Sequence, residues 1–172
     1  MEECAVLEIF GQADNASALI TLADEAEVDG LALDWNVRSP ASEIVKAMVE
    51  ASDDGEWLRL VVDDCDDLER TRKACKEAGL SYIHTRGISG DEGYHSAAFW
   101  APGWEKEFET GLLNGVELGL SLVQVKHALD VGPRALHALI QDYERNTLAT
   151  LEKSLRLSPE VVSELKSAVP TL

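Results

Sequence analysis

The sequence predicts an α+β protein in which a ferredoxin-like sheet carries helices on one face and is followed by a C-terminal helical extension. Strand and helix patterns alternate along residues 1–103. Two of the expected strands alternate apolar and polar residues, whereas the buried strands of a doubly wound α/β sheet, the alternative architecture, are apolar throughout. From Trp104 onward helical patterns predominate. We therefore expect an acidic domain over residues 1–103 and a helical extension over 104–172 that mediates self-association.

The strands of the first domain are expected where apolar residues recur with a period of two. In residues 30–37, for example, Leu31, Leu33 and Trp35 would share one face of a half-exposed strand. In chain order, the sequence predicts a strand at 4–11, a helix at 14–28, a strand at 30–37, a helix at 41–52, a strand at 56–64, a helix at 66–79, and a hairpin formed by 80–87 and 94–103.

The ends of the helices carry recognisable capping residues. Asp14 or Asn15 suits the start of the first helix, and Ser39 followed by Pro40 suits the start of the second. For the third, Asp66 is a cap with a glutamate three residues later, and Gly79 is a natural C-terminal stop.

The extension contains three glycines spaced four residues apart, Gly111, Gly115 and Gly119. On a helix this spacing admits a second backbone closely, although the same stretch also alternates like a strand, and we expect a helix. Further on, Gly132 ends one helix and Pro133 begins the next, which packs on its neighbour through Leu136, Ile140, Tyr143 and Leu151. Ser158 and Pro159 begin a last short helix.

The net charge of −17 argues against polyanionic partners. The chain has 32 acidic and 15 basic residues, and 22 of the acidic ones lie in residues 1–103. Nucleic acid and anionic membranes should be repelled by such a chain. No apolar run approaches the roughly 18 residues needed to cross a bilayer.

The cysteines favour a reducing compartment. Cys4, Cys65 and Cys75 are odd in number, form no C-x-x-C pair and follow no basic, apolar leader. We therefore expect a cytoplasmic protein.

Two families share part of the pattern. The segment from Leu58 to Arg86 is similar to the strand-helix-strand half of small-molecule regulatory domains of the ACT type, without a ligand motif. Residues 60–79 also resemble the first strand and helix of a response-regulator receiver, in which paired acidic residues hold magnesium. That resemblance implies a later phosphorylatable aspartate and a later lysine at strand ends, and neither follows here, since Asp91 lies in a glycine-rich loop.

An acidic run after the strand expected at 56–64 is one candidate site. Asp63, Asp64, Asp66 and Asp67 offer oxygen ligands to a hard cation such as magnesium or calcium, and acidic capping of the next helix also accounts for them.

A more varied set of side chains surrounds the expected hairpin turn. Because His84 and His95 would come from its two strands, they would suit a transition metal or a general acid and base if they shared a face. With Asp63 and Asp64 they are the candidate metal ligands. The full set of candidate ligand-binding residues is His84, Arg86, Asp91, Glu92, Tyr94 and His95.

Residues 121–141 match only part of a helix-turn-helix pattern. The apolar spacing is right, but Lys126 and Asp130 stand where the motif usually has a small residue and a glycine. The second helix would offer the DNA few base-edge donors. The matching apolar positions are Val125, Leu129, Val131, Leu136 and Leu139.

No nucleophile, phosphate-loop, zinc or cofactor motif is present in the sequence. The favoured function is therefore a non-catalytic regulatory or small-ligand-binding module that assembles as a homodimer or larger species. The alternatives are a metal-dependent enzyme or metal-binding protein that uses the His84–His95 hairpin, and a DNA-binding regulator.

Overall fold

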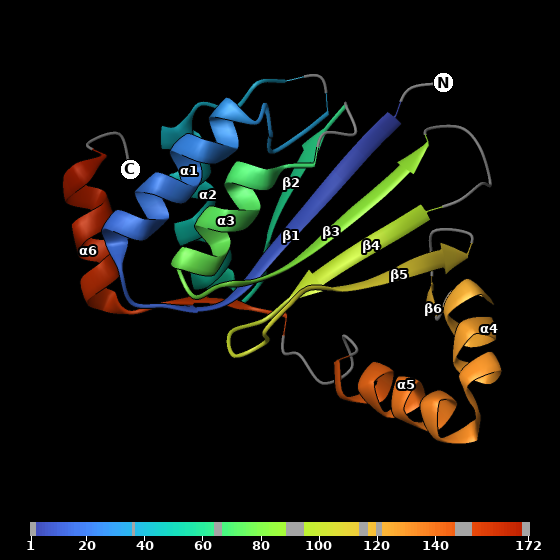
Figure 1. Ribbon diagram of the computed structural model, residues 1–172. Helices are drawn as coiled ribbons and strands as arrows, with labels where there is room; N and C mark the ends of the chain where they lie inside the picture. The colour runs from blue at the N-terminus through green and yellow to red at the C-terminus, as the bar shows by residue number, and fades with distance from the viewer. Residues whose placement is uncertain are drawn as a thin grey trace.

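The computed structural model describes residues 3–35, 37–63, 67–88, 95–113, 117–119, 122–146 and 153–169 (Figure 1). Its elements are, in chain order, β1 Glu3–Ala13, α1 Ala16–Val28, α2 Ala41–Asp54, β2 Leu58–Val62, α3 Glu69–Glu77, β3 Ser81–Ile88, β4 His95–Trp100, β5 Phe108–Leu113, β6 Glu117–Gly119, α4 Leu122–Val131, α5 Pro133–Asn146, β7 Leu155–Leu157 and α6 Pro159–Ala168.

The strands form a seven-stranded sheet in the order β2-β1-β3-β4-β5-β6, and β7 pairs with β1. Strand β1 is antiparallel to both β2 and β3, so α3, which joins β2 to β3, crosses the strand between them. From β3 to β6 the strands continue as an antiparallel meander. The predicted α+β class is confirmed, whereas the ferredoxin-like strand order is not.

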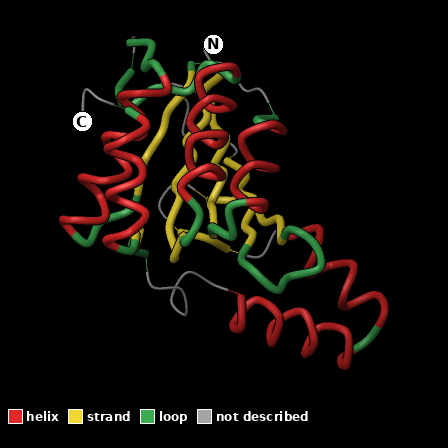
Figure 2. The backbone as a smooth tube through the Cα atoms, turned by 90° about the vertical axis from the view of Figure 1, so that its left-hand side faces the viewer, coloured by secondary structure: helices red, strands yellow, loops and turns green. Residues whose placement is uncertain are grey.

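Helices α1, α2, α3 and α6 lie on one face of the sheet, as expected (Figures 1 and 2). The main core lies between these helices and the strands. Ala5, Leu7 and Ile9 of β1 point into it because alternate residues of a strand face the same side. The helix side supplies small and branched residues such as Leu19 of α1 and Ile44 of α2.

The opposite face of the sheet has a smaller apolar cluster of its own. Phe10, Ile83, Ala97 and Phe99 are buried there, and Trp104 packs against them. The buried side chains of this cluster are therefore already covered within one chain.

The chain beyond residue 103 contributes more to this body than the predicted extension implies. Residues 108–113 and 117–119 are strands β5 and β6, not a helix, and they continue the sheet. Strand β7 runs parallel to the end of β1, and α6 buries Val161 and Leu165 in the main core. Helices α4 and α5 match the predicted helical extension, with the expected break at Gly132, whose φ is +130°, and α6 begins where the last short helix was predicted but packs into the main core.

Residues 30–37 do not form the predicted strand. Among the described residues of this stretch, Ala32 alone pairs, with Val61 on the outer side of β2, and the next backbone N–H, that of Leu33, donates to the hydroxyl oxygen of Ser39. Ser39 therefore does not cap α2 as predicted, and the carboxylate of Glu27 instead accepts a hydrogen bond from the N–H of Ala41.

Two predicted caps are present. The side chain of Asn15 accepts a hydrogen bond from the N–H of Ala18 at the start of α1. The hydroxyl of Ser158 does the same for Val161 in α6, with Pro159 in the first turn. Across the described ranges, no helix combines the length and apolar character that crossing a bilayer requires.

Candidate functional site

A pocket of about 540 Å³ lies between α3, β3 and the segment that connects β4 to β5. We call it the α3–β3 pocket. Arg72 and Lys76 reach it from α3, where a spacing of four residues puts them on one helix face. The lining residues are Asp67, Glu69, Arg72, Lys73, Lys76, Arg86, Glu107 and Glu109.

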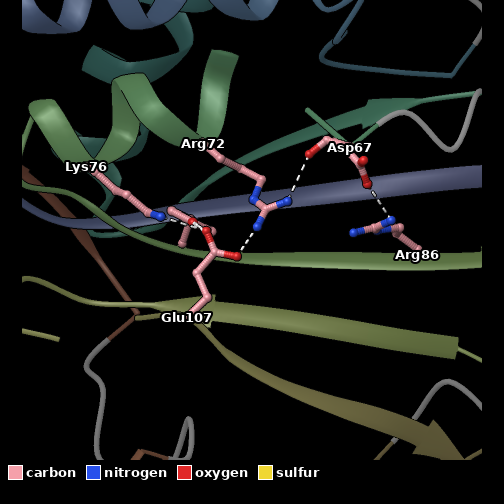
Figure 3. A network of polar contacts seen from close by, with 6 residues as sticks. Asp67, Arg72, Lys76, Arg86 and Glu107 are labelled. Atoms are coloured by element: carbon pink, nitrogen blue, oxygen red, sulfur yellow. Dashed lines mark hydrogen bonds and ion pairs between the residues drawn. The ribbon is translucent and has the colours of Figure 1, made fainter. Parts of the chain in front are cut away.

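The carboxylate of Glu107 is the centre of a polar network in this pocket (Figure 3). Its Oε2 accepts a hydrogen bond from Nη2 of Arg72, and its Oε1 accepts one from the hydroxyl of Tyr82. Nζ of Lys76 lies 2.8 Å from the same Oε1. Three donors from two different elements therefore converge on one carboxylate, which is only 15% exposed.

Asp67 connects the two arginines of the pocket. Its carboxylate Oδ1 lies 2.7 Å from Nη1 of Arg86, and its backbone carbonyl accepts a 3.0 Å hydrogen bond from Nη1 of Arg72. The Asp67 side chain is 72% exposed, so its ion pair with Arg86 is solvated and contributes at most about 1 kcal/mol. Little free energy is therefore needed to separate Arg86 from Asp67, so the guanidinium group of Arg86 is able to contact an anion.

Two aromatic rings form the apolar side of the network. The rings of Tyr82 and Trp100 are stacked with centroids 6.2 Å apart. Arg72 lies over the Tyr82 ring and Lys76 over the Trp100 ring, each cation 5.9 Å from the ring centroid. These contacts hold both cations close to the sheet.

His84 lies between Tyr82 and Arg86 on the same face of β3, and it is only 1% exposed. Among the described residues, neither ring nitrogen has a hydrogen-bond partner, and neither does Nε of Arg72. Burial, helped by the nearby positive charges of Arg72 and Arg86, lowers the pKa of His84 from 6.5 to about 4. The imidazole is therefore neutral at physiological pH and has one N–H to donate.

Burial also shifts the pKa of two other groups in the network. The pKa of Lys76 is lowered by burial and by the neighbouring Arg72 cation. The pKa of Tyr82 is raised by burial, against the opposing effect of its contact with Arg72. Tyr82 therefore remains a neutral hydrogen-bond donor at neutral pH.

Of the residues predicted from the sequence, Arg86 and Asp67 line this pocket. His84 does not line it but lies two residues from Arg86 on the same face of β3. His84 pairs with Ala98 of β4, and His95 stands three residues away opposite Leu112 of β5, so the register does not place the two histidines opposite each other. Asp64, Asp66, Asp91, Glu92 and Tyr94 lie outside the described residues.

Asp63 lies in a second pocket, of about 480 Å³, on the outer side of β2. Asp29 and Asp34 also line that pocket, but the carboxylate of Asp29 already accepts hydrogen bonds from Thr71 of α3. Within the described ranges, no group of three or more His, Cys, Asp or Glu side chains is arranged to hold a metal ion.

The sequence did not reveal the centre of the network. Arg72, Lys76, Tyr82 and Glu107 come from three separate parts of the chain, and only the spacing of the two α3 cations is a local signal. Comparison of the chain with protein-family models, with characterised proteins and with solved structures finds no match.

Proposed function

We propose that this protein is a non-catalytic regulatory module that binds a small anionic molecule in the α3–β3 pocket. The observation that carries the proposal is a pair of buried donors that have no acceptor among the described residues: Nε of Arg72, which lines the pocket, and the N–H of the neutral His84, which lies two residues from the pocket-lining Arg86. A buried donor without a partner destabilises the protein by about 1–3 kcal/mol. An anionic oxygen that accepts hydrogen bonds from these groups removes this penalty, so its binding is favoured.

Four basic side chains of the pocket support the same ligand class, and four acidic side chains, Asp67, Glu69, Glu107 and Glu109, balance their charge in the absence of a ligand. Arg72, Lys73, Lys76 and Arg86 are four of the 15 basic residues of a chain whose net charge is −17, and all four line this pocket. Arginine side chains recognise carboxylate and phosphate groups through paired hydrogen bonds. The ligand is therefore a small molecule with a carboxylate or phosphate group.

Nuclear magnetic resonance titration with acetate and with inorganic phosphate, at constant ionic strength, tests this proposal. We expect saturable shifts of backbone amide signals in α3 and β3. Arg86→Gln should weaken the binding about tenfold, the change that about 1.4 kcal/mol produces. Lys46→Gln is the matched control, since it removes one positive charge from the exposed surface of α2 and should leave binding unchanged.

Shifts that rise linearly without saturation, equal in both variants and the unmodified protein, would show only non-specific ion association. That result would overturn the proposal.

We also propose that copies of the chain assemble through the hairpin of α4 and α5. The hairpin exposes five large apolar side chains, Leu122, Val123, Leu129, Val131 and Ile140. Residues 122–146 carry three basic and three acidic residues, so the whole net charge of −17 lies on the rest of the chain. A second hairpin is therefore the surface that this one can meet without charge repulsion, and two such hairpins would form a four-helix bundle.

The position of the hairpin also suits assembly. In Figures 1 and 2 it projects from the body to one side, so the acidic bodies of two copies need not meet. Light scattering on the purified protein tests this assembly. More than one chain per particle is expected, and a single chain at all concentrations would exclude it.

A further inference from the structure

We propose that Glu107 is an internal competitor for the ligand: its carboxylate occupies half of the binding edge of Arg72, and the anionic group of the ligand displaces it. This inference rests on the proposed function of the α3–β3 pocket. It adds the ligand class, a carboxylate, and it identifies the group, Glu107, that occupies the donors when no ligand is bound.

The geometry of a guanidinium group carries the argument. The Nε–H and one Nη2–H bond project side by side from the same edge, and a carboxylate can accept from both at once. Of the two donors on this edge of Arg72, Glu107 accepts a hydrogen bond only from Nη2. The other donor, Nε, is buried and has no partner among the described residues. The edge is therefore half used, and a ligand carboxylate that takes both positions makes one hydrogen bond more than Glu107 does.

The other contacts of Glu107 define the chemistry of the ligand. The site already holds a planar carboxylate, which Arg72, Lys76 and Tyr82 contact together. A ligand carboxylate that replaces it inherits all three donors, and the nearby His84 and Arg86 remain available to a second polar group. We therefore expect a carboxylate to bind more tightly than inorganic phosphate, which is tetrahedral and carries more charge.

Glu107 can leave without disturbing the core. It belongs to the segment between β4 and β5, in which Pro102, Gly103, Glu105 and Lys106 are exposed, and Gly103 has a φ of +92°. A rotation of the Glu107 side chain alone would bring its carboxylate into water, while Trp104 of the same segment keeps its packing on the apolar cluster that contains Phe99. The charge balance of the pocket is kept because one carboxylate replaces another.

Acetate titration of three variants tests the competition. Glu107→Gln removes the competing charge, and Glu107→Asp keeps the charge but shortens the side chain, so both should bind acetate more tightly than the unmodified protein, Glu107→Gln by about tenfold. Glu109→Gln is the matched control, because it removes the same charge from an exposed residue of the same pocket. It should change the affinity much less.

A second readout follows Arg72 directly. The proton signal of its Nε–H, assigned by comparison with Arg72→Lys, should move downfield on addition of acetate because that donor gains an acceptor. Thermal unfolding of each variant shows whether it is folded. If Glu107→Gln does not fold, Glu107→Asp still tests the competition.

The outcomes separate the two proposals. An equal gain in affinity for the Glu107→Gln and Glu109→Gln variants, or no gain for either Glu107 variant, would overturn the competition while leaving anion binding intact. Tighter binding of inorganic phosphate than of acetate would overturn the carboxylate assignment. No saturable binding by any form of the protein would overturn the proposed function itself.

Discussion

The imidazole of His84 is neutral in the folded protein because its surroundings disfavour a proton. It is 1% exposed and lies close to two guanidinium groups, and both effects lower its pKa to about 4. A neutral imidazole beside Arg72 and Arg86 adds no further repulsion between cations. It can therefore stay buried beside these two arginines at neutral pH.

This shift predicts how stability depends on pH. Because the unfolded chain protonates this histidine near pH 6.5 and the folded protein near pH 4, the unfolded state binds more protons between these values, and stability falls as the pH is lowered through them. The loss attributable to His84 reaches at most about 3 kcal/mol. Chemical denaturation at pH 7 and pH 4 should therefore show a smaller loss in the His84→Gln variant than in the unmodified protein.

His127→Gln, at an exposed position of α4, is the control for this measurement and should lose as much stability as the unmodified protein. If the His84→Gln variant loses the same amount too, the imidazole is not buried in its neutral form.

Two helices of the body, α2 and α3, are capped at their starts by side chains from the end of α1. Asp29, the residue after α1, accepts hydrogen bonds from the N–H of Thr71 at 3.0 Å and from its hydroxyl at 2.7 Å. Glu27, in the last turn of α1, caps α2 in the same way. The end of α1 therefore fixes where two other helices begin, and α3 carries the cations of the pocket.

We expect Asp29→Ala to lower the free energy of unfolding by about 1–2 kcal/mol, because it removes a cap and leaves the Thr71 hydroxyl, which is fully buried, without its acceptor. Asp24→Ala, at an exposed position of the same helix, should change it by less than about 0.5 kcal/mol. Urea denaturation gives both values. Equal values for the two substitutions would show that the Asp29 contacts do not stabilise α3.

Element by element, some local signals in the sequence predicted the structure and others did not. The caps of α1 and α6 and the break at Gly132 follow from single residues, and the apolar run at residues 58–62 forms strand β2, although Val61 is buried as well as Leu58 and Leu60. The strand predicted at residues 30–37 and the Ser39 cap were wrong because the backbone N–H of Leu33 donates to the hydroxyl of Ser39 instead. The glycines near residue 115 were misinterpreted for a physical reason. Gly111 and Gly119 are cross-strand partners in the β5–β6 pair, so their spacing reflects a hairpin register, and not a helix face.

The α3–β3 pocket was only half predictable. The sequence named His84 and Arg86 among the candidates around the hairpin turn, and their spacing of two along β3 puts them on a common face. Glu107 meets Arg72 only because β4 returns beside β3 and the following segment turns back over α3, and no spacing in the sequence encodes that contact.

At the scale of the whole molecule, the proposals assign ligand binding to the acidic body and assembly to the neutral hairpin, and one substitution tests this division. Leu129→Glu places a charge on the exposed apolar surface of α4 and should reduce the protein to single chains in light scattering. Val37→Glu is the matched control, since Val37 is also 56% exposed but lies on the body. It should leave the assembly unchanged. A loss of assembly in both variants would place the contact elsewhere.

The return of the chain end to the first strand has a consequence for synthesis. Strand β7 pairs with the last residues of β1, Leu155 donates its N–H to the carbonyl of Glu56, and Leu165 of α6 is completely buried in the core. On the ribosome, β1 and α1 are made roughly 150 residues before these partners. The nascent body therefore exposes apolar surface until β7 and α6 have been made, for longer than a protein built from local contacts would.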